Sequence, residues 1–331
     1  MGLDIECERD PAAWNELVGR APHGTPFHRY ECLTAAARHT NTELAPLVGY
    51  NGQEPVGVFP LSTRSLGPVT VAFSPPPRLK LTYGGPLLLD QGGLKQRKAE
   101  RRNRQLVEGC LTWLDEACGP VYTHVRTGTR YDDARPFLWA SFDVTPGYTH
   151  VVDISPPEDD LLARFSSDAR KNVTDPEPDV LIREEGVGGI ERIIDQVRAR
   201  HAEQGRAYDL PAAFPVDLYR DLPDGVVRPY VCRVDGSFAG GIVALESGDT
   251  VYRWQGGATP TVDVPVNDLV DWRIIRDARD RGLGRYDLVG AGDPGISQYK
   301  AKFAPSVEPY FQMTRSTLAA ELVREVYGRV R

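Results

Sequence analysis

Three glycines and a lysine near the end of the chain are the residues whose types and spacing most clearly suggest chemistry. Residues 286–300 read YDLVGAGDPGISQYK, in which Gly290, Gly292 and Gly295 follow a strand-like segment in the order G-x-G-x-x-G. This order is typical of a turn that cradles a dinucleotide pyrophosphate at a helix N-terminus. Lys300 ends the segment, and its cation needs another chemical explanation if the glycines do not bind a nucleotide.

The surroundings of the glycines argue against a dinucleotide site. Such a site needs a βαβ unit of about 30 residues, with an acidic residue about 20 positions further on for the ribose hydroxyls. The end of the next predicted strand instead offers Thr314 and Arg315. Asp293 and Pro294 also lie inside the motif, where a carboxylate would repel pyrophosphate and a proline would stiffen the loop. The glycines therefore indicate a sharp turn from a strand to a short helix.

The elements that must position Lys300 occur in two similar halves. Each half runs helix, helix, antiparallel strands, long helix, strand, although the two halves share no visible letter-by-letter identity. Asn51-Gly52 and Asp235-Gly236 predict a tight hairpin in each half. Residues 91–117 form the longest helical pattern, and 157–172 predict one helix with acids in its first turn and basic residues in its last.

Together these patterns predict an α/β (α+β) protein with two domains. Strands in a meander, followed by a helix and one more strand, describe a mixed and largely antiparallel sheet instead of a doubly wound one. We expect an N-terminal domain at 1–150 and a C-terminal domain at 151–315 that carries Lys300. A final helix at 316–331 is expected to pack back on the first domain.

Composition narrows the class of protein. The chain has 331 residues, 41% of them hydrophobic and 26% charged, and no apolar run long enough to span a membrane. The acidic N-terminus lacks the features of a secretory signal, which predicts a cytoplasmic location. The net charge of −7 argues against DNA as a partner, although a local basic cleft is compatible with it. The five cysteines show neither C-x-x-C nor metal-ligand spacing, so no metal site is predicted.

The second half resembles a known family. Residues 235–305 are similar to the C-terminal module of the Fem family, the aminoacyl-tRNA-dependent transferases that build peptidoglycan cross-bridges, and to related acyltransferases with two GNAT-like domains. The matching features, in order, are a glycine-containing hairpin, an aromatic strand that ends in small residues, a helix that contains Trp272, Arg281-Gly282 at its end, Tyr286-Asp287, Gly290 and an aromatic-lysine pair. PFH at 26–28 and YGGP at 83–86 are also similar to the family, so the resemblance covers nearly the whole chain.

The resemblance implies two tandem GNAT-like domains and a role for the aromatic-lysine pair, here Tyr299 and Lys300. In the family this lysine is thought to stabilise charge on the acyl carbonyl oxygen, which is chemically sound because aminolysis passes through an oxyanion. The plain alternative is that Lys300 lies on a solvated helix face beside Lys302. Asp287 and Asp293, both near Lys300 in sequence, are the candidate general bases. His124, His150 and His201 show no partner pattern and are interpreted as structural or surface residues.

Several further residues are candidates for substrate binding. Arg170 and Lys171 resemble basic residues that meet an anionic acceptor or RNA phosphate in the family, or they simply complement their own helix dipole. The YGGP loop, with Tyr83, Gly84 and Gly85, either lines a cleft or is a plain turn.

The basic run KQRKAERRNR at 95–104 is a solvated helix face or a docking surface for tRNA, and it contains no interleaved aromatic residue.

The acyl donor is left open between aminoacyl-tRNA and acyl-CoA. CoA-dependent GNAT enzymes cradle the pyrophosphate with a glycine-rich turn before a helix N-terminus. The corresponding segment contains Arg253 and Gln255 before its glycines, but Asp263 and two prolines interrupt the approach to the helix that begins near Asn267. This departure favours charged tRNA as the donor and partner, and no tightly bound cofactor is expected.

Three functions follow from this reading. The first is an N-acyltransferase of Fem-like type that acts on an amine of a small molecule or a cell-envelope precursor. The second is a CoA-dependent N-acetyl- or acyltransferase. The third is a catalytically silent double-GNAT module that binds a ligand or a partner.

Overall fold

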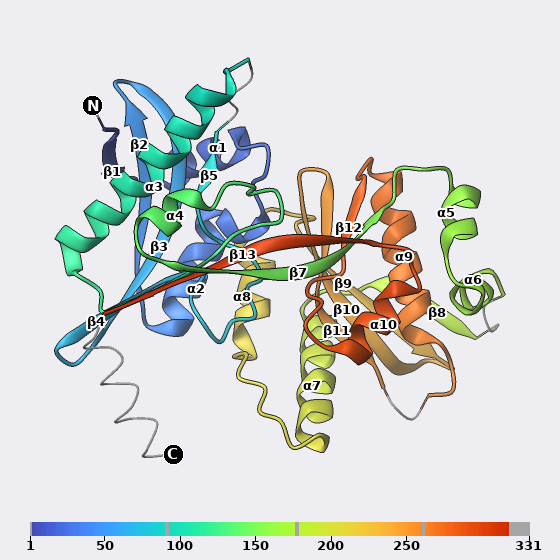
Figure 1. Cartoon of the computed structure of the whole chain (residues 1–331). Helices are drawn as coiled ribbons and strands as arrows, with labels where there is room; N and C mark the ends of the chain where they lie inside the picture. Colours follow the sequence, from blue (N-terminus) through green and yellow to red (C-terminus); the bar gives the residue numbers. More distant parts are fainter. Residues whose placement is uncertain (1, 90–92, 176–178, 260–261, 318–331) are drawn as a thin grey trace. The chain divides into compact units, whose positions relative to one another are not determined.

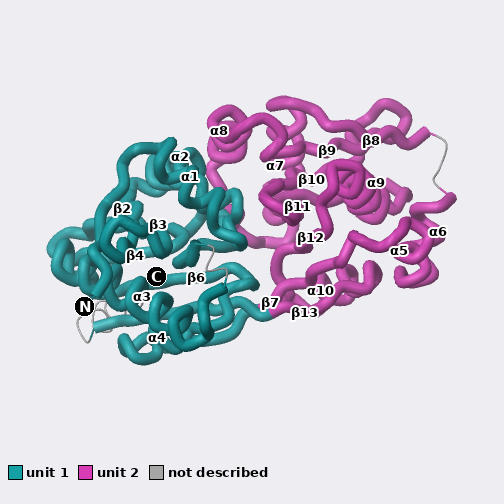
Figure 2. The backbone as a smooth tube through the Cα atoms, turned by 90° about the horizontal axis from the view of Figure 1, so that it is seen from above, with its two compact units in different colours: residues 1–147, 309–331 teal, residues 148–308 magenta. Residues whose placement is uncertain are grey.

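A computed structural model describes residues 2–89, 93–175, 179–259 and 262–317 (Figure 1). The described residues form two compact units: those up to Gly147 together with those from Pro309 onward, and those within Tyr148–Glu308 (Figure 2). The predicted domain boundary at 150/151 lies within the long strand β7 (Asp143–Asp153), through which the chain passes from unit 1 to unit 2. The chain returns to unit 1 within β13 (Ser306–Ser316). The helix predicted at 316–331 lies almost wholly outside the described residues.

Unit 1 contains a sheet in the order β1-β2-β3-β4-β6-β13, with β5 paired to β3. Among the described residues its strands pair antiparallel, except β4 with β6, which are parallel. Its strands are β1 (Asp4–Cys7), β2 (Glu43–Asn51), β3 (Glu54–Leu66), β4 (Val69–Ser74), β5 (Leu87–Leu88) and β6 (Tyr122–Arg126). Its helices are α1 (Pro11–Arg20), the 3-10 helix η1 (Pro26–His28), α2 (Tyr30–Thr40), α3 (Gln96–Cys118) and α4 (Arg135–Trp139).

Unit 2 contains a sheet in the order β7-β12-β11-β10-β9-β8, in which only β11 and β12 are parallel. Its other strands are β8 (Val180–Glu184), β9 (Val227–Val234), β10 (Ser237–Ser247), β11 (Thr250–Ala258) and β12 (Arg285–Asp287). Its helices are α5 (Glu158–Arg164), α6 (Ser167–Thr174), α7 (Val187–Glu203), α8 (Ala213–Asp221), α9 (Val266–Asp280) and α10 (Pro294–Ala301). The predicted class, mixed and largely antiparallel sheets flanked by helices, is confirmed.

Helices α7 and α9 cover opposite faces of the unit 2 sheet. Ile242 of β10 belongs to the core cluster that includes Val270 and Ile274 of α9. A Cβ on its neighbour Gly241 would instead meet Ile193 of α7. Because successive strand residues point to opposite faces, these contacts place one helix on each side of the sheet.

The structure confirms the hairpin predicted at Asp235-Gly236 and corrects one predicted helix. Asp235 and Gly236 form a two-residue loop with φ angles of 49° and 75°, as the predicted hairpin requires. The single helix predicted at 157–172 is wrong, because the structure has α5 and α6 there. The break occurs at Ser166, whose side chain accepts a hydrogen bond from the Ala169 amide and thereby caps a new helix.

Glycine is required at one position of the β10–β11 hairpin and not at the next. Gly256 has φ 144°, and a Cβ there would lie 2.1 Å from the Gly241 carbonyl oxygen. Gly257 has no neighbouring atom within 4 Å of such a Cβ. We expect Gly256→Ala to lower the free energy of unfolding by about 2 kcal/mol or more, because backbone must move.

The matched control is Gly257→Ala, which we expect to stay within about 1 kcal/mol of wild type. Urea denaturation of both variants measures the difference. Equal destabilisation would contradict this account of the hairpin.

Candidate functional site

Lys300 lies in the last turn of α10, with its ammonium group turned into the protein. The side chain is 5% exposed. Its Nζ donates hydrogen bonds to the carbonyl oxygens of Val289 (2.7 Å) and Gly290 (2.6 Å). The alternative of a solvated helix face therefore does not describe this lysine. A buried ammonium held by backbone carbonyls is a positioned charge.

The turn that holds Lys300 has an unusual backbone. Val289 and Gly290 have φ angles of 54° and 84°. A β-branched residue in this left-handed region costs about 1–3 kcal/mol, so the surrounding structure must fix it. Of the three motif glycines, Gly290 alone has a positive φ, whereas Gly292 and Gly295 do not. The G-x-G-x-x-G spacing therefore reflects one conformationally required glycine.

Asp287 and Thr149 fix this turn from the sheet. The Asp287 carboxylate accepts hydrogen bonds from Thr149 Oγ1 (2.7 Å) and from the Val289 amide (2.8 Å). Thr149 Oγ1 in turn accepts a hydrogen bond from the Gly290 amide (2.9 Å). Both side chains are buried. Asp287, a candidate base in the sequence, thus makes structural contacts directly beside the Lys300 turn.

A second buried carboxylate, Asp271 of α9, gathers three donors. It accepts hydrogen bonds from Arg253 Nε (2.8 Å), from Tyr299 Oη (2.8 Å) and from Tyr286 Oη. Asp271 is fully buried, and these donors come from β11, α10 and β12. Burial raises the pKa of both tyrosines well above the ordinary value, so they remain neutral donors. We call these four residues the Asp271 cluster.

The pKa of Lys300 lies close to neutral pH. Burial, and then the positive charge of Arg253, lower the pKa of Lys300 to about 8, although Asp287 and Asp271 oppose the shift. At neutral pH the ammonium form predominates, and above a pH of about 8 the free amine predominates. A lysine of this kind can donate to an oxyanion when protonated and accept a proton when neutral.

His150 is a residue that sequence reasoning missed. It follows Thr149 on β7, is 7% exposed, and its carbonyl accepts a hydrogen bond from the Leu288 amide (2.8 Å). Neither ring nitrogen has a hydrogen-bond partner among the described residues. Burial, and then the charge of Lys300, lower the pKa of His150, so the imidazole is neutral. The sequence does not show that His150 lies near Lys300, because the pairing of β7 with β12 brings the two residues together.

The other predicted residues of unit 2 lie around this site to different degrees. Asn267 accepts a hydrogen bond from Arg253 (3.3 Å) and so joins the Asp271 cluster at its edge. Gln255 accepts a hydrogen bond from Tyr208 (2.6 Å). Asp293 caps α10 by accepting a hydrogen bond from the Ile296 amide (3.0 Å), so its role as a base stays a prediction.

Asp268 of α9 links α6 to the end of α10. Asp268 of α9 contacts Asn172 Nδ2 (2.6 Å) and Lys302 Nζ (3.4 Å). The Lys302 ammonium lies 5.5 Å from the centre of the Tyr299 ring. Arg170 and Lys171 are exposed, and neither forms an ion pair within the described part of the chain. Their position leaves them available to an anionic substrate.

The YGGP loop belongs to unit 1 and is buried. The Gly84 amide donates to the Arg126 carbonyl (2.9 Å), and the Gly85 amide donates to Ser74 Oγ (2.9 Å). Tyr83 packs edge-on against Phe27 of the PFH segment, with ring centres 6.3 Å apart. The two N-terminal motifs thus pack together inside unit 1, and the prediction that the loop lines a cleft stays a prediction.

Part of the chain matches a known family model. Residues 164–301 match the family model described as acetyltransferase (GNAT) domain. No curated protein matches the chain in sequence.

Among solved structures, FemX is similar with a TM-score of 0.74 and 11% identity, over 93% of this chain and 96% of that chain. L-PGS from Bacillus licheniformis has a TM-score of 0.59 and 9% identity, over 97% of both chains. The C-terminal domain of a putative lysylphosphatidylglycerol synthetase from Agrobacterium fabrum has a TM-score of 0.56 and 13% identity, over 94% of this chain and 93% of that one.

The predicted resemblance to Fem-type and other GNAT-like acyltransferases is confirmed by these likenesses in fold. The acyltransferase class is confirmed by the family match, which includes Asp271, Tyr299 and Lys300. No helix within the described ranges has the length and apolar character needed to cross a membrane. The described residues also contain no cluster of three or more ligating side chains that could hold a metal ion.

The Asp271 cluster gives a stability prediction. Asp271→Asn keeps the size of the side chain but leaves the buried charge of Arg253 without a counter-ion, so we expect a loss of about 3–5 kcal/mol in the free energy of unfolding. Asp277→Asn, on the same helix, removes the ion pair with the half-exposed Arg273 (2.8 Å) and should cost less than about 1 kcal/mol. Urea denaturation compares the two; a cost below 1 kcal/mol for Asp271→Asn would contradict the role assigned to it.

Proposed function

We propose that the protein is an N-acyltransferase that uses the Lys300 ammonium to stabilise the oxyanion of an acyl ester under attack by an amine. The observation that carries this proposal is the buried ammonium of Lys300, held by two carbonyl oxygens within the GNAT-matched residues. A cation fixed in a protein interior requires no reorganisation when charge develops on the substrate oxygen. A third ammonium proton remains for that oxygen, because two are used by Val289 and Gly290.

The reaction balances with the residues present. The amine nitrogen attacks the ester carbonyl carbon, a C–N bond forms, and the carbonyl oxygen becomes the oxyanion. The ester C–O bond then breaks, the amine loses one proton, and the leaving oxygen gains one. His150, whose imidazole is neutral and has no described hydrogen-bond partner, is the proposed acceptor of the amine proton, in preference to the hydrogen-bonded Asp287.

Aminoacyl-tRNA is the proposed donor. The first turn of α9 carries Asp268, which is 3% exposed, where a CoA pyrophosphate would need an electropositive helix end. Arg253, the residue best placed in sequence to meet a pyrophosphate, contacts Asp271 instead. The similar structures named as lysylphosphatidylglycerol synthetase and FemX support aminoacyl transfer as the related chemistry.

The proposed acceptor is an amine of a small molecule or of a cell-envelope precursor. Arg170 and Lys171 are the cations proposed to meet its anionic groups, since both are exposed on α6 beside the Asp268 contacts. Gln255 and Asn267 are proposed to line the substrate path with Arg253.

Transfer should depend on Lys300. We expect Lys300→Met to lower kcat by about 10²–10³-fold, since one oxyanion donor is lost. Lys302→Met, two residues further on, should retain most of the activity. Radiolabelled aminoacyl-tRNA and acetyl-CoA are supplied in parallel as donors with a panel of amines, and acyl transfer is measured.

The folded state of Lys300→Met is checked by circular dichroism, because two carbonyls lose their donor. Folded Lys300→Met with wild-type transfer would overturn the catalytic role. Transfer from acetyl-CoA and none from aminoacyl-tRNA would overturn the donor.

The pH profile should report the protonation of Lys300. The donor form is the ammonium, so kcat/KM should fall as the pH rises through about 8, the value to which burial lowers this pKa. Lys302→Met should keep this descending limb. Activity that instead rises through pH 8 would show that the neutral amine acts as the base.

A further inference from the structure

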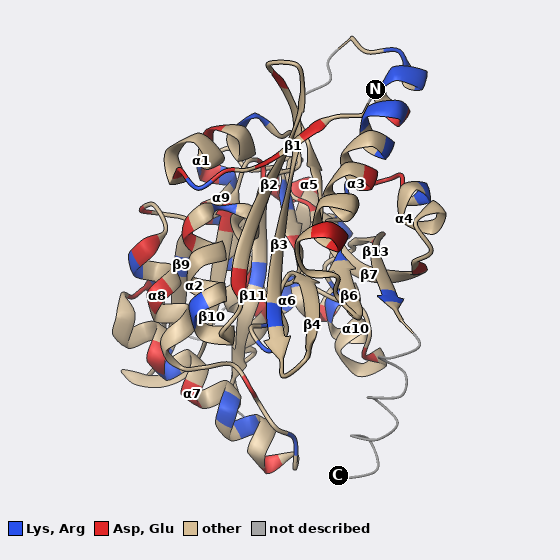
Figure 3. Ribbon diagram, turned by 90° about the vertical axis from the view of Figure 1, so that its left-hand side faces the viewer, with Lys and Arg blue, Asp and Glu red and all other residues tan. Residues whose placement is uncertain are grey.

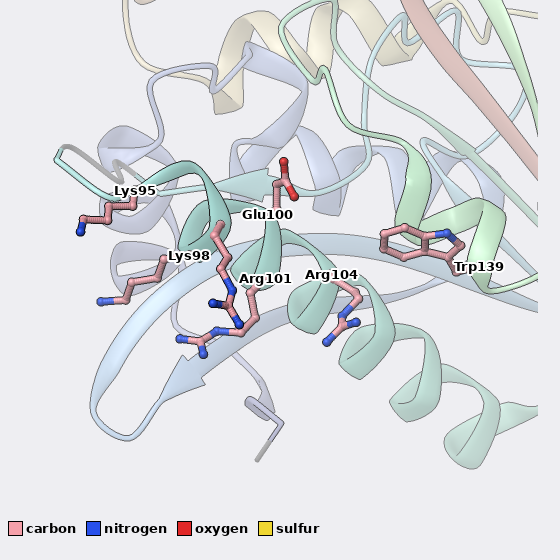
Figure 4. A pocket seen from close by; sticks show the side chains of 7 residues that line it. Lys95, Lys98, Glu100, Arg101, Arg104 and Trp139 are labelled. Atoms are coloured by element: carbon pink, nitrogen blue, oxygen red, sulfur yellow. The ribbon is translucent and has the colours of Figure 1, made fainter.

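The first turns of α3 form one side of a basic groove on unit 1. The groove has a volume of about 570 Å³ and is lined by Lys95, Arg97, Lys98, Glu100, Arg101, Arg104 and Trp139 (Figure 4). The five cations are exposed. We call this surface the α3 groove. Positions 97, 101 and 104 follow helical spacing and so lie along one side of α3.

The cations of the α3 groove are poorly neutralised. Glu100 contacts Arg135 of α4 (3.4 Å) and Gln96 (3.0 Å), and in Figure 4 it points to a different side from the groove cations. Arg104 lies 3.8 Å from Glu108, in an exposed pair that contributes little. Arg97, Lys98 and Arg101 form no ion pair in the described part of the chain. Lys and Arg residues are concentrated at this end of α3 (Figure 3).

Helix stability does not explain these charges. Cations near a helix N-terminus oppose the helix dipole, and the first turn of α3 contains no acidic residue. Arg102 of the same run stabilises the fold, because it is buried and donates two hydrogen bonds to Glu54 (3.0 and 2.9 Å). The exposed cations make no such buried contact, which leaves them available to an anionic ligand.

Trp139 supplies the aromatic side chain that the basic run itself lacks. It comes from α4 and is 59% exposed. The Arg135 guanidinium lies 5.7 Å from its ring centre. An exposed aromatic ring beside exposed cations is the combination that binds single-stranded or looped RNA, because cations neutralise phosphates while the ring stacks on a base.

We propose that the α3 groove binds RNA, with its cations on the phosphates and Trp139 stacked on an unpaired base. The choice of RNA rests on the proposed function, in which aminoacyl-tRNA is the donor. An anionic membrane surface is the competing occupant, since Leu138 beside Trp139 is 53% exposed. RNA is favoured because the surface is hollowed and α4 has five residues, too few for the long apolar face of an interfacial helix.

The test measures binding of a fluorescein-labelled, uncharged RNA stem-loop with a single-stranded 3′ end by anisotropy at several KCl concentrations. We expect Arg97→Ala/Arg101→Ala to weaken binding at least about tenfold and to reduce the salt slope by about 1.5. Trp139→Ala should weaken binding by about tenfold without changing the slope, since stacking is not ionic. Arg9→Ala/Arg20→Ala, which removes two exposed cations of unit 1 outside the groove, should bind as wild type does.

Two outcomes overturn the proposal: RNA binding that neither groove variant changes, or groove-dependent binding to phosphatidylglycerol vesicles with none to RNA. The proposed function is judged separately. Lys300→Met should bind the RNA as wild type does while losing transfer. In transfer assays the arginine variant should raise KM for aminoacyl-tRNA and leave kcat near wild type. RNA binding at the groove without any transfer from aminoacyl-tRNA would overturn the proposed function alone.

Discussion

The buried Asp271 carboxylate is the constraint on which unit 2 depends. It is fully buried and accepts hydrogen bonds from Arg253, Tyr286 and Tyr299, which belong to three different elements. A charge in this position is tolerated only with a counter-ion and satisfied lone pairs. The cluster therefore fixes α10 against the sheet at Tyr299, and the next residue along α10 is Lys300. Stability and the position of the chemistry come from the same contacts.

Lys300 shows how the fold changes the pKa of a lysine. The protein desolvates the ammonium, places Arg253 nearby, and holds the lysine with the carbonyls of a strained turn. The strained turn costs folding free energy. Desolvation and the charge of Arg253 lower the pKa of Lys300 to about 8. Asp287 and Thr149 compensate by binding the turn amides. The same lysine on a solvated helix would have no such property.

The basic run at 95–104 illustrates how one residue type takes different roles. Arg102 points inward to Glu54 and serves the fold, whereas Arg97 and Arg101 remain in solvent beside Trp139. Helical periodicity separates these positions, because residues one apart face different directions. The aromatic residue of this surface, Trp139, belongs to α4. The sequence of the basic run at 95–104 therefore cannot by itself indicate a surface that is both basic and aromatic.

The sequence by itself determined the class of fold and the hairpins, because these depend on local periodicity and on glycine conformation. It also indicated the sharp turn after β12 and marked Lys300 as a candidate residue, because these follow from the order of the motifs. It did not determine the break between α5 and α6, which rests on a cap at Ser166. Only the tertiary structure placed Asp271 at the centre of the site, His150 near Lys300 and Trp139 beside the α3 cations. These neighbourhoods join residues far apart in the chain, and burial, which sets their pKa values, exists only once the sheet and helices pack.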